Sequence, residues 1–297
     1  MSQIFDALHQ SQGGSGPRDF ANAKELLQAV EERGGNAVAV VESPRQALRV
    51  REGLRQFPTA EVRLPEHSKF VCLSATESLP AEKFRYLATR LRHMQQKRSL
   101  NRLVVTSSVA GEGKSMVAAN LACALAAGKQ QVLLVEGDLR RPSLASQFGV
   151  DDLPGLSQVL QSAPECEKNI HQLEGSGLCI LLAGSVHTNP LEFMEPGRLS
   201  ALMDGLSAEF DWVVIDSPPV LPLADTSMWM RLADAIILVT RPGVTTKRQL
   251  QQTLETLEQS KLLGAILNAS SETAKNSYYY HYATHSGTSS DATSAKK

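Results

Sequence analysis

The sequence predicts an α/β fold with a mostly parallel sheet and helices on both faces. From residue 103 onward, short apolar runs typical of buried strands alternate with helical stretches. A glycine-rich loop, SVAGEGKS at residues 108–115, lies between one such run and a stretch rich in Ala and Leu. Acidic residues follow two later apolar runs, at the carboxyl ends of strands where parallel sheets bind ligands.

The expected elements follow from residue patterning. Short apolar runs predict strands at residues 103–106, 131–135, 179–182, 212–215, 235–239 and 262–267. Helical periodicity predicts helices at residues 80–92, 114–127, 156–161, 199–208, 223–232 and 246–260. Right-handed crossovers between such strands place a ligand site at their carboxyl ends.

Three regions are expected along the chain. Residues 1–78 carry no recognisable chemistry and are interpreted as an accessory or docking region, with helices at 2–10, 20–33 and 44–57 and an apolar run at 37–41. Residues 79–270 contain the alternating pattern. Residues 271–297 are polar and poor in aliphatic side chains, which predicts a disordered, mobile tail.

Composition narrows the function classes. The 297 residues carry a formal net charge of −1, which gives no general electrostatic reason to expect nucleic acid. The four cysteines form no CxxC pair, as expected for reduced thiols in a cytosolic protein. No apolar stretch approaches the ~20 residues needed to cross a bilayer, and the first residues do not resemble a secretory signal. We therefore expect a cytoplasmic protein that reaches any membrane through a partner.

The glycine-rich loop is a candidate phosphate site. Gly111 and Gly113 allow the tight path by which backbone amides converge on phosphate oxygens. Lys114 offers charge to the β- and γ-phosphates, and the Ser115 hydroxyl is a magnesium ligand candidate. Ser108 replaces the first glycine of the strict GxxxxGK[ST] pattern. The residues expected to contact nucleotide are Ala110, Gly111, Glu112, Gly113, Lys114, Ser115 and Met116.

Two acidic segments complete the candidate site. Glu136 and Asp138 lie in LLVEGDLRRP, and Asp216 lies in WVVIDSPP. A carboxylate at such a strand end can hold magnesium directly or through water. Arg140 and Arg141 lie just after Asp138; either both contact phosphate, or one of them pairs with an acidic neighbour instead.

At these residues the chain resembles the bacterial tyrosine kinases (BY-kinases) of capsule and exopolysaccharide systems, which share a broad P-loop class with the partitioning ATPases. The resemblance runs from about residue 82 to 282. It covers the acidic motif at 136–140, Asn189-Pro190-Leu191, the 216–219 segment and a tyrosine cluster. The partitioning ATPases carry a lysine where this chain has Val109, which favours the kinase branch.

The resemblance implies ATP and Mg²⁺ as cofactors and assigns roles to residues. Lys114 and Ser115 bind phosphate and magnesium, and Asp138 and Asp216 organise the metal. An acidic residue at position 136 assists tyrosine deprotonation or metal binding, and Asn268 contacts adenine. Lys114, Glu136, Asp138 and Asp216 thus form the expected catalytic set. The family usually has Asp at position 136, where this chain has Glu. The extra methylene of Glu displaces the carboxylate, and a displacement of ~1 Å can reduce rates about 100-fold.

The tail carries the expected phosphoacceptors, Tyr278, Tyr279, Tyr280 and Tyr282. Each phosphate adds about −1.5 to −2 charges, so a filled cluster repels itself strongly. An extended chain from Asn268 to Tyr278 reaches ~35 Å at most, into its own site or a neighbour's. The resemblance implies exchange between subunits.

The expected function is an ATP-dependent tyrosine autokinase that regulates polysaccharide synthesis or export. A nucleotide-switched assembly ATPase and an inactive nucleotide-binding scaffold remain alternatives. The resemblance implies three kinds of partner: a membrane-embedded polysaccharide co-polymerase or activator, a cognate tyrosine phosphatase, and further copies of the chain in a ring. In the family's ExxRxxR ring-assembly pattern Glu82 and Arg85 fit, but Ala88 replaces the last arginine.

Overall fold

The computed structural model describes residues 3–5, 57–66, 68–150, 153–162, 166–185, 189–192, 194–221 and 225–269. The chain divides into two units: Met1–Ala7 with Phe57–Lys297, and Leu8–Gln56. The second unit lies outside the described residues. The helices predicted at 20–33 and 44–57 (except Phe57), the apolar run at 37–41 and the tail at 271–297 therefore lie outside them as well.

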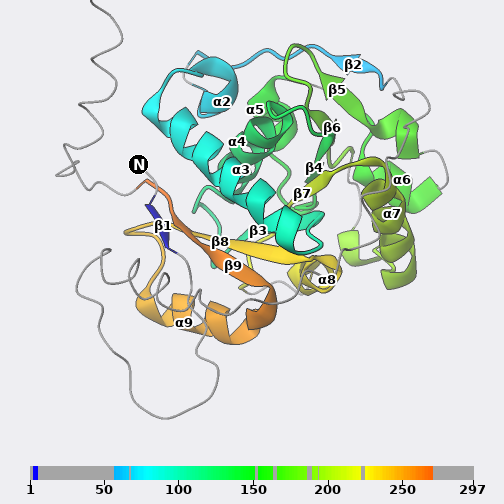
Figure 1. Ribbon diagram of the computed structural model, residues 1–297. Coiled ribbons are helices and arrows are strands. Elements are labelled where there is room, and N and C mark those ends of the chain that lie inside the picture. The colour runs from blue at the N-terminus through cyan, green and yellow to red at the C-terminus, as the bar shows by residue number, and fades with distance from the viewer. Residues whose placement is uncertain are drawn as a thin grey trace, which may run out of the picture. The chain divides into compact units, whose positions relative to one another are not determined.

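A single sheet organises the described residues, with the strand order β1-β9-β8-β3-β7-β4-β6-β5-β2 (Figure 1). Its pairings are parallel except β1 with β9 and β5 with β6. The strands are β1 (Gln3–Phe5), β2 (Thr59–Ala60), β3 (Arg102–Ser107), β4 (Val132–Glu136), β5 (His171–Leu173), β6 (Cys179–Leu181), β7 (Trp212–Asp216), β8 (Ala235–Thr240) and β9 (Leu262–Leu267). The predicted mostly parallel α/β fold is confirmed.

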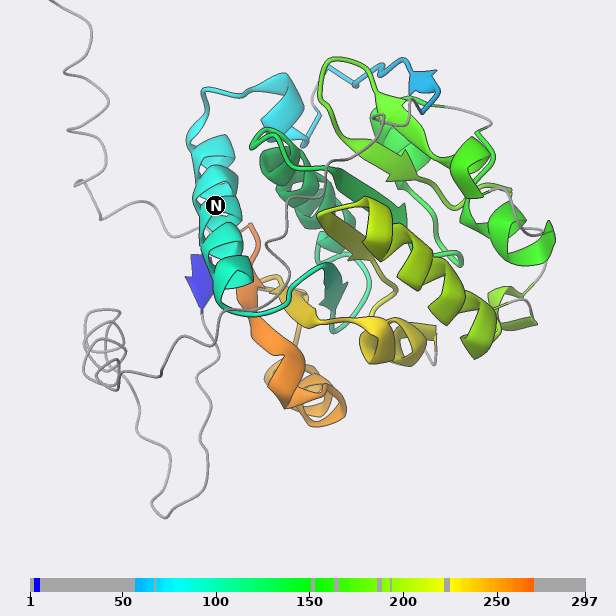
Figure 2. The same ribbon diagram turned by 45° about the vertical axis from the view of Figure 1, so that its right-hand side comes forward.

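The connections between strands are mostly helical (Figure 2). The α-helices are α2 (Val71–Ser74), α3 (Leu79–Lys97), α4 (Lys114–Ala126), α5 (Leu144–Phe148), α6 (Leu156–Ser162), α7 (Pro196–Glu209), α8 (Asp225–Leu232) and α9 (Lys247–Thr256). Short 3₁₀ turns are η2 (Cys166–Asn169), η3 (Pro190–Glu192) and η4 (Gln259–Lys261). Helix α3 is longer than predicted: the Ser78 side chain caps its start, and at its end Met94, beyond the predicted last residue, still packs against the core.

Alternate residues of the central strands face two different helical layers. In β3, Leu103 and Val105 join the core formed with α3 and α4, whereas Val104 joins the core formed with α6, α7 and α8. Side chains of successive strand residues point to opposite faces, so one apolar run supplies both cores. The continuous apolar runs in the sequence therefore correspond to strands buried on both faces.

The helix predicted over residues 2–10 is wrong at Gln3–Phe5, which form β1. These residues pair antiparallel with β9, with Ile4 opposite Ile266. Apolar spacing over so few residues does not distinguish a helix from a strand. The edge of β9 supplies unpaired backbone groups, which a strand satisfies and an amphipathic helix does not.

Residues 57–78 belong to the main unit, which differs from the accessory region predicted for residues 1–78. Strand β2 pairs with β5. Phe70 is 1% exposed, and its ring centroid lies 4.5 Å from that of Phe148. The Asn120 side chain accepts a hydrogen bond from the Cys72 amide and donates one to the Lys69 carbonyl, which joins this segment to α4.

Strand order determines where the acidic segments meet. Strand β7 lies between β3 and β4, and its register sets Asp216 opposite both Val105 and Glu136. The loops that follow these three strands therefore emerge together at one edge of the sheet. That edge carries the phosphate-loop candidate and both acidic segments.

Candidate nucleotide site

The loop between β3 and α4 has the backbone shape of a phosphate-binding loop. Gly111 and Gly113 have φ angles of +86° and +89°, which other residues rarely adopt. A Cβ atom on Gly113 would collide with the side-chain nitrogen of Asn268. Helix α4 begins at Lys114, so its unpaired amides and the positive end of its dipole face the loop. Ala110 and Gly111 are exposed, whereas Met116 is partly buried on α4.

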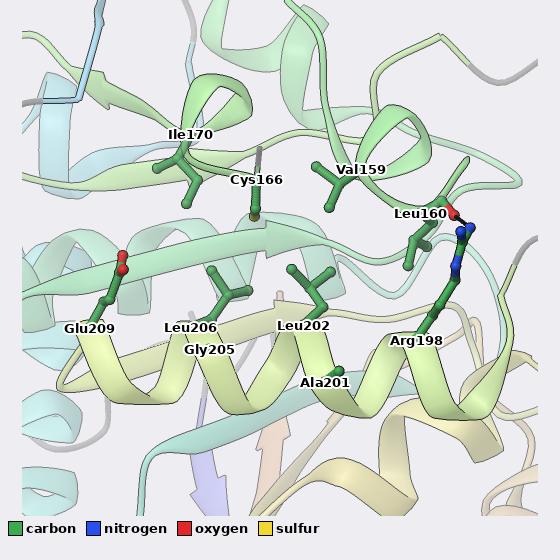
Figure 3. Close-up of a pocket in the computed structure, with 10 residues that line it drawn as sticks. All are labelled: Val159, Leu160, Cys166, Ile170, Arg198, Ala201, Leu202, Gly205, Leu206 and Glu209. Carbon is green, nitrogen blue, oxygen red and sulfur yellow. Dashed lines mark hydrogen bonds between the residues drawn. The ribbon is translucent and has the colours of Figure 1, made fainter. Parts of the chain in front are cut away.

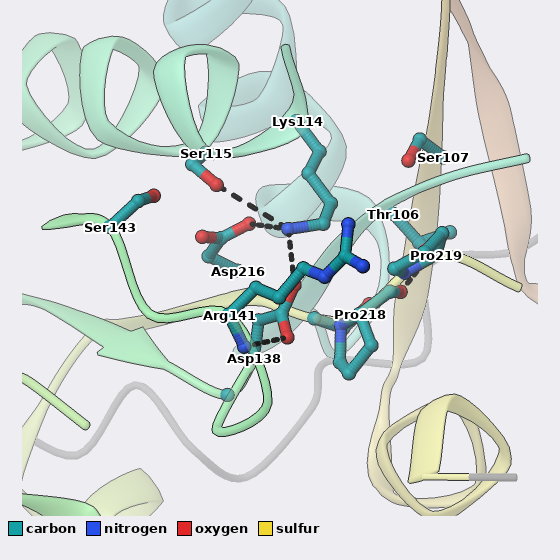
Figure 4. A network of polar contacts seen from close by, with 12 residues as sticks. Thr106, Ser107, Lys114, Ser115, Asp138, Arg141, Ser143, Asp216, Pro218 and Pro219 are labelled. Atoms are coloured by element: carbon teal, nitrogen blue, oxygen red, sulfur yellow. Dashed lines mark hydrogen bonds and ion pairs between the residues drawn. The ribbon is translucent and has the colours of Figure 1, made fainter. Parts of the chain in front are cut away.

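Lys114 forms the centre of an ionic cluster (Figure 4). Its ammonium nitrogen lies 2.8 Å from Asp138 Oδ2, 3.6 Å from Asp216 Oδ1 and 3.4 Å from the Ser115 hydroxyl. Burial alone would lower the pKa of Lys114, but the carboxylates of Asp216 and Asp138 outweigh burial and raise it. The structure thus brings together four of the residues that the sequence assigned to phosphate and metal.

Asp216 is a fully buried carboxylate with unused acceptors. Neither of its oxygens has a hydrogen-bond partner within the described part of the chain. Burial raises the pKa of Asp216 to about 6, although Lys114 opposes the shift. A buried carboxylate without hydrogen bonds is costly unless a cation is bound. This acceptor and the nearby Ser115 hydroxyl fit a divalent cation.

The donor set also indicates which kind of metal fits. In the described segments, no three His, Cys, Asp or Glu side chains gather into a metal-binding group. Magnesium prefers oxygen ligands and commonly takes one or two carboxylates together with substrate phosphates. One hydroxyl and the carboxylates of Asp138 and Asp216 fit magnesium held jointly with a nucleotide.

Glu136 lies in the same region, but its carboxylate already accepts three backbone hydrogen bonds. Oε1 accepts from the amides of Ser143 and Leu144, both at 2.6 Å, and Oε2 accepts from the Ala183 amide at 3.0 Å. Burial raises the pKa of Glu136, and these three hydrogen bonds oppose the shift. The carboxylate therefore ties the start of α5 to the loop after β6. The catalytic role predicted for Glu136 stays a prediction.

Glu112 points inward and joins the phosphate loop to the turn after β8. Its carboxylate accepts from the Val109 amide at 2.8 Å, from the Arg241 amide at 3.2 Å and from the Thr245 hydroxyl. The Asn268 side chain donates to the Glu112 carbonyl at 2.8 Å. The sequence assigned Glu112 and Asn268 to the nucleotide, and the structure places both in the bracing of the loop. Nothing in the sequence pattern signalled the contact with Thr245.

The remaining predicted residues lie apart from this cluster or outside the described residues. Arg140 pairs with the buried Asp225, which decides between the two alternatives left open for it. The four tail tyrosines lie outside the described residues. Among the residues that are described, no helix is long and apolar enough to traverse a bilayer.

A cavity of ≈ 380 Å³ lies away from the phosphate loop, between α6, η2 and α7 (Figure 3). Its walls are mainly apolar, from residues such as Val159, Leu202 and Leu206. The Arg198 guanidinium at one end donates to the Leu160 carbonyl. The cavity brings no cluster of charged or nucleophilic side chains together.

Known proteins similar to this chain identify its family. The family described as "ParA: NUBPL iron-transfer P-loop NTPase" matches residues 99–296. The tyrosine-protein kinase YwqD of Bacillus subtilis (strain 168) is 33% identical over 216 residues, which cover 72% of this chain and 91% of YwqD. The chain belongs to the bacterial tyrosine-protein kinases. The resemblance noted from its motifs is therefore confirmed.

Solved structures agree with this family membership. The kinase domain of the Escherichia coli tyrosine kinase ETK has a TM-score of 0.63 and 28% identity, covering 71% of this chain and 90% of that one. The chimerical protein CapA2B2 has a TM-score of 0.62 and 27% identity, covering 70% and 92%. Some curated relatives are much longer: this kinase spans about a third of the etk protein of Escherichia coli (strain K12), 36%, at 28% identity.

Proposed function

We propose that this kinase uses ATP to phosphorylate its own C-terminal tyrosines and thereby regulates exopolysaccharide or capsule synthesis or export. One observation carries the proposal. Lys114, Asp138 and Asp216 meet beside the Ser115 hydroxyl at the mouth of a phosphate-binding loop. Membership of the bacterial tyrosine-protein kinases supports tyrosine as the acceptor.

Nucleotide binding follows from this cluster. The amides of the loop and of the first turn of α4 bind the phosphates, and Lys114 turns from Asp138 to the β- and γ-oxygens. Ser115, Asp138 and Asp216 would hold magnesium, which supplies neutralising charge to the phosphates when bound. The carboxylates lose their lysine partner as the nucleotide arrives, so a cation at the same place keeps their charge compensated.

Transfer then requires positioning more than covalent help from the protein. The phenolic oxygen forms a bond to the γ-phosphorus while the bond from that phosphorus to the bridging oxygen breaks. ADP leaves with the bridging oxygen, and the phenolic proton passes to water or to a carboxylate of the cluster. Lys114 and the loop amides hold the charge that develops on the leaving group.

The path of the chain supports delivery of the tail to this site. Asn268 directly follows β9, donates to the phosphate loop through its side chain, and donates through its backbone amide to the Thr240 carbonyl at 2.7 Å. Asn268, which precedes the tail in the sequence, therefore lies beside the loop. The ~35 Å reach from Asn268 to Tyr278 allows transfer within a subunit or between subunits.

Incubation with ATP and magnesium, followed by mass spectrometry of the tail, tests the proposal. We expect phosphate on Tyr278, Tyr279, Tyr280 and Tyr282 of the wild type. Lys114→Met should abolish it, and Lys97→Met, which alters an exposed lysine at the end of α3, should leave it unchanged. Phosphate release without phosphotyrosine would instead support the assembly ATPase. Persistent tail phosphotyrosine in Lys114→Met would exclude autophosphorylation through this loop.

We further propose three partners on the basis of family membership: a membrane-embedded polysaccharide co-polymerase or activator, a tyrosine phosphatase, and further copies of the kinase in a ring. An exposed ion pair between Glu82 and Arg85 on α3 is available for contacts between copies. Ala88 is fully buried, so the third position of the ring-assembly pattern packs into the core of this chain. Light scattering of the wild type and Arg85→Ala tests the ring.

A further inference from the structure

Two adjacent arginines in the second acidic segment have different surroundings. The Arg140 guanidinium makes a two-pronged contact with Asp225, with Nε at 2.5 Å from Oδ2 and Nη2 at 3.1 Å from Oδ1. Asp225 is 2% exposed and begins α8. Arg140 therefore compensates a buried carboxylate and joins the loop after β4 to α8.

Arg141 is held by its backbone and leaves its side chain available. Its amide donates to Asp138 Oδ1 at 3.1 Å, and the other oxygen of that carboxylate accepts from Lys114. The side chain is exposed, and its guanidinium makes no hydrogen bond or ion pair with the residues the structure describes. In Figure 4 the side chain extends from this anchored backbone towards Lys114 and away from Ser143.

We propose that Arg141 is a catalytic residue whose guanidinium binds oxygens of the γ-phosphate during transfer. This inference rests on the proposed kinase function and deepens it. The loop amides and Lys114 approach the phosphates from α4, whereas Arg141 comes from the loop after β4. The transferring phosphoryl group would thus be held by cations from two different elements.

The chemistry of the guanidinium suits this task. Its planar fork presents paired N–H donors that match phosphate oxygens, and it stays charged at every relevant pH. It neither gains nor loses a proton in the step, and it stabilises charge on the γ-oxygens as the bridging bond breaks. Arginines that act in this way accelerate phosphoryl transfer by about 10³–10⁵-fold. The bond between Asp138 and the Arg141 amide couples the position of this cation to the metal site.

Arg141→Ala tests the proposal, with Arg248→Ala as a matched control because Arg248 is an exposed arginine on α9. We expect Arg141→Ala to keep the wild-type melting temperature and its ADP affinity within about twofold. At saturating ATP its single-turnover transfer to the tail should fall by about 10²-fold or more. Arg141→Lys should be intermediate, because it keeps the charge but loses the paired donors.

Three outcomes would overturn or separate the proposals. A transfer rate within twofold of the wild type in Arg141→Ala would overturn the role of Arg141. Unchanged transfer with weaker binding of a phosphotyrosine peptide would also overturn it, because the arginine would then bind the product tail. If wild-type protein transfers nothing to its tail, the kinase function fails. In that case the role of Arg141 is supported if Arg141→Ala weakens ATP binding more than ADP binding. It is overturned if the ratio of the two affinities is unchanged.

Discussion

At the scale of single residues, similar side chains in this site differ in their partners. Glu136 is the last residue of β4 and Asp216 is the last residue of β7, and both are buried. Glu136 accepts three backbone amides, whereas Asp216 accepts none within the described residues. Glu136 is therefore satisfied by backbone amides, whereas Asp216 has only the ion pair with the Lys114 ammonium among the described residues and keeps acceptors for a further cation.

The pH dependence of stability tests the state of Asp216. Its folded pKa of about 6 lies above the ordinary 3.8, so between these values the folded chain holds a proton that the unfolded chain lacks. Stability from this group therefore falls as pH rises from about 4 to about 6. Without nucleotide or magnesium, Asp216→Asn should be more stable than wild type at pH 7.5, by roughly 2–3 kcal/mol. Urea unfolding across this range measures the difference, and parallel pH profiles would contradict it.

Glu136→Gln tests whether Glu136 acts as a brace or as a catalyst. A glutamine keeps one acceptor oxygen, and its NH₂ group then faces an amide donor of Ser143, Leu144 or Ala183. We expect a loss of about 1–3 kcal/mol in the free energy of unfolding. Glu255→Gln, an exposed glutamate on α9, should change it little. Unchanged stability with a large loss of tail phosphorylation would instead assign Glu136 to the chemistry.

At the scale of elements, the phosphate loop depends on segments that are distant in sequence. Glu112 connects it to the turn between β8 and α9, and Asn268 connects it to the end of β9. Both elements lie on the same side of β3 in the strand order. These contacts hold the loop in a defined shape from within the chain, which reduces the ordering required on nucleotide binding.

Glu112→Ala should weaken nucleotide binding even though the Glu112 side chain braces the loop and is not itself a phosphate ligand. The substitution leaves the Val109 and Arg241 amides and the Thr245 hydroxyl without their acceptor. Because unsatisfied donors cost about 1–3 kcal/mol, we expect an ADP dissociation constant roughly 5- to 150-fold higher. Thr245→Val removes a single donor and should have the smaller effect. Titration calorimetry gives both constants, and equal affinities in all three proteins would rule out this bracing role.

At the scale of the whole molecule, the segment before α3 belongs to the main unit. Phe70 packs on Phe148, and the backbone around Cys72 is bonded to Asn120 on α4. Removal of this segment therefore uncovers the layer that supports the phosphate loop. A domain boundary at residue 78 would consequently remove buried core residues from the kinase.

Two truncations measure this contribution. Deletion of residues 1–55 removes β1 but keeps everything from Phe57 onward, and deletion of residues 1–73 also removes β2 and Phe70. We expect the longer deletion to be less stable than the shorter one by at least ~3–5 kcal/mol, the usual effect of losing a buried phenylalanine. Denaturant unfolding of both proteins provides the comparison. Equal stabilities would show that residues 57–73 add nothing to the fold.

The sequence by itself determined the sheet class, the six central strands, the phosphate loop and the acidic positions, because each leaves a local pattern of apolar spacing or motif. It did not determine β1, β2 or β5, which are two or three residues long and form only where another strand offers an edge. Only the tertiary structure distinguished two identical neighbours: the Arg140 guanidinium pairs with the buried Asp225, whereas the Arg141 side chain is exposed and its backbone amide donates to Asp138. Partners for a charge come from elements distant in the chain, and local spacing carries no record of which strands become neighbours.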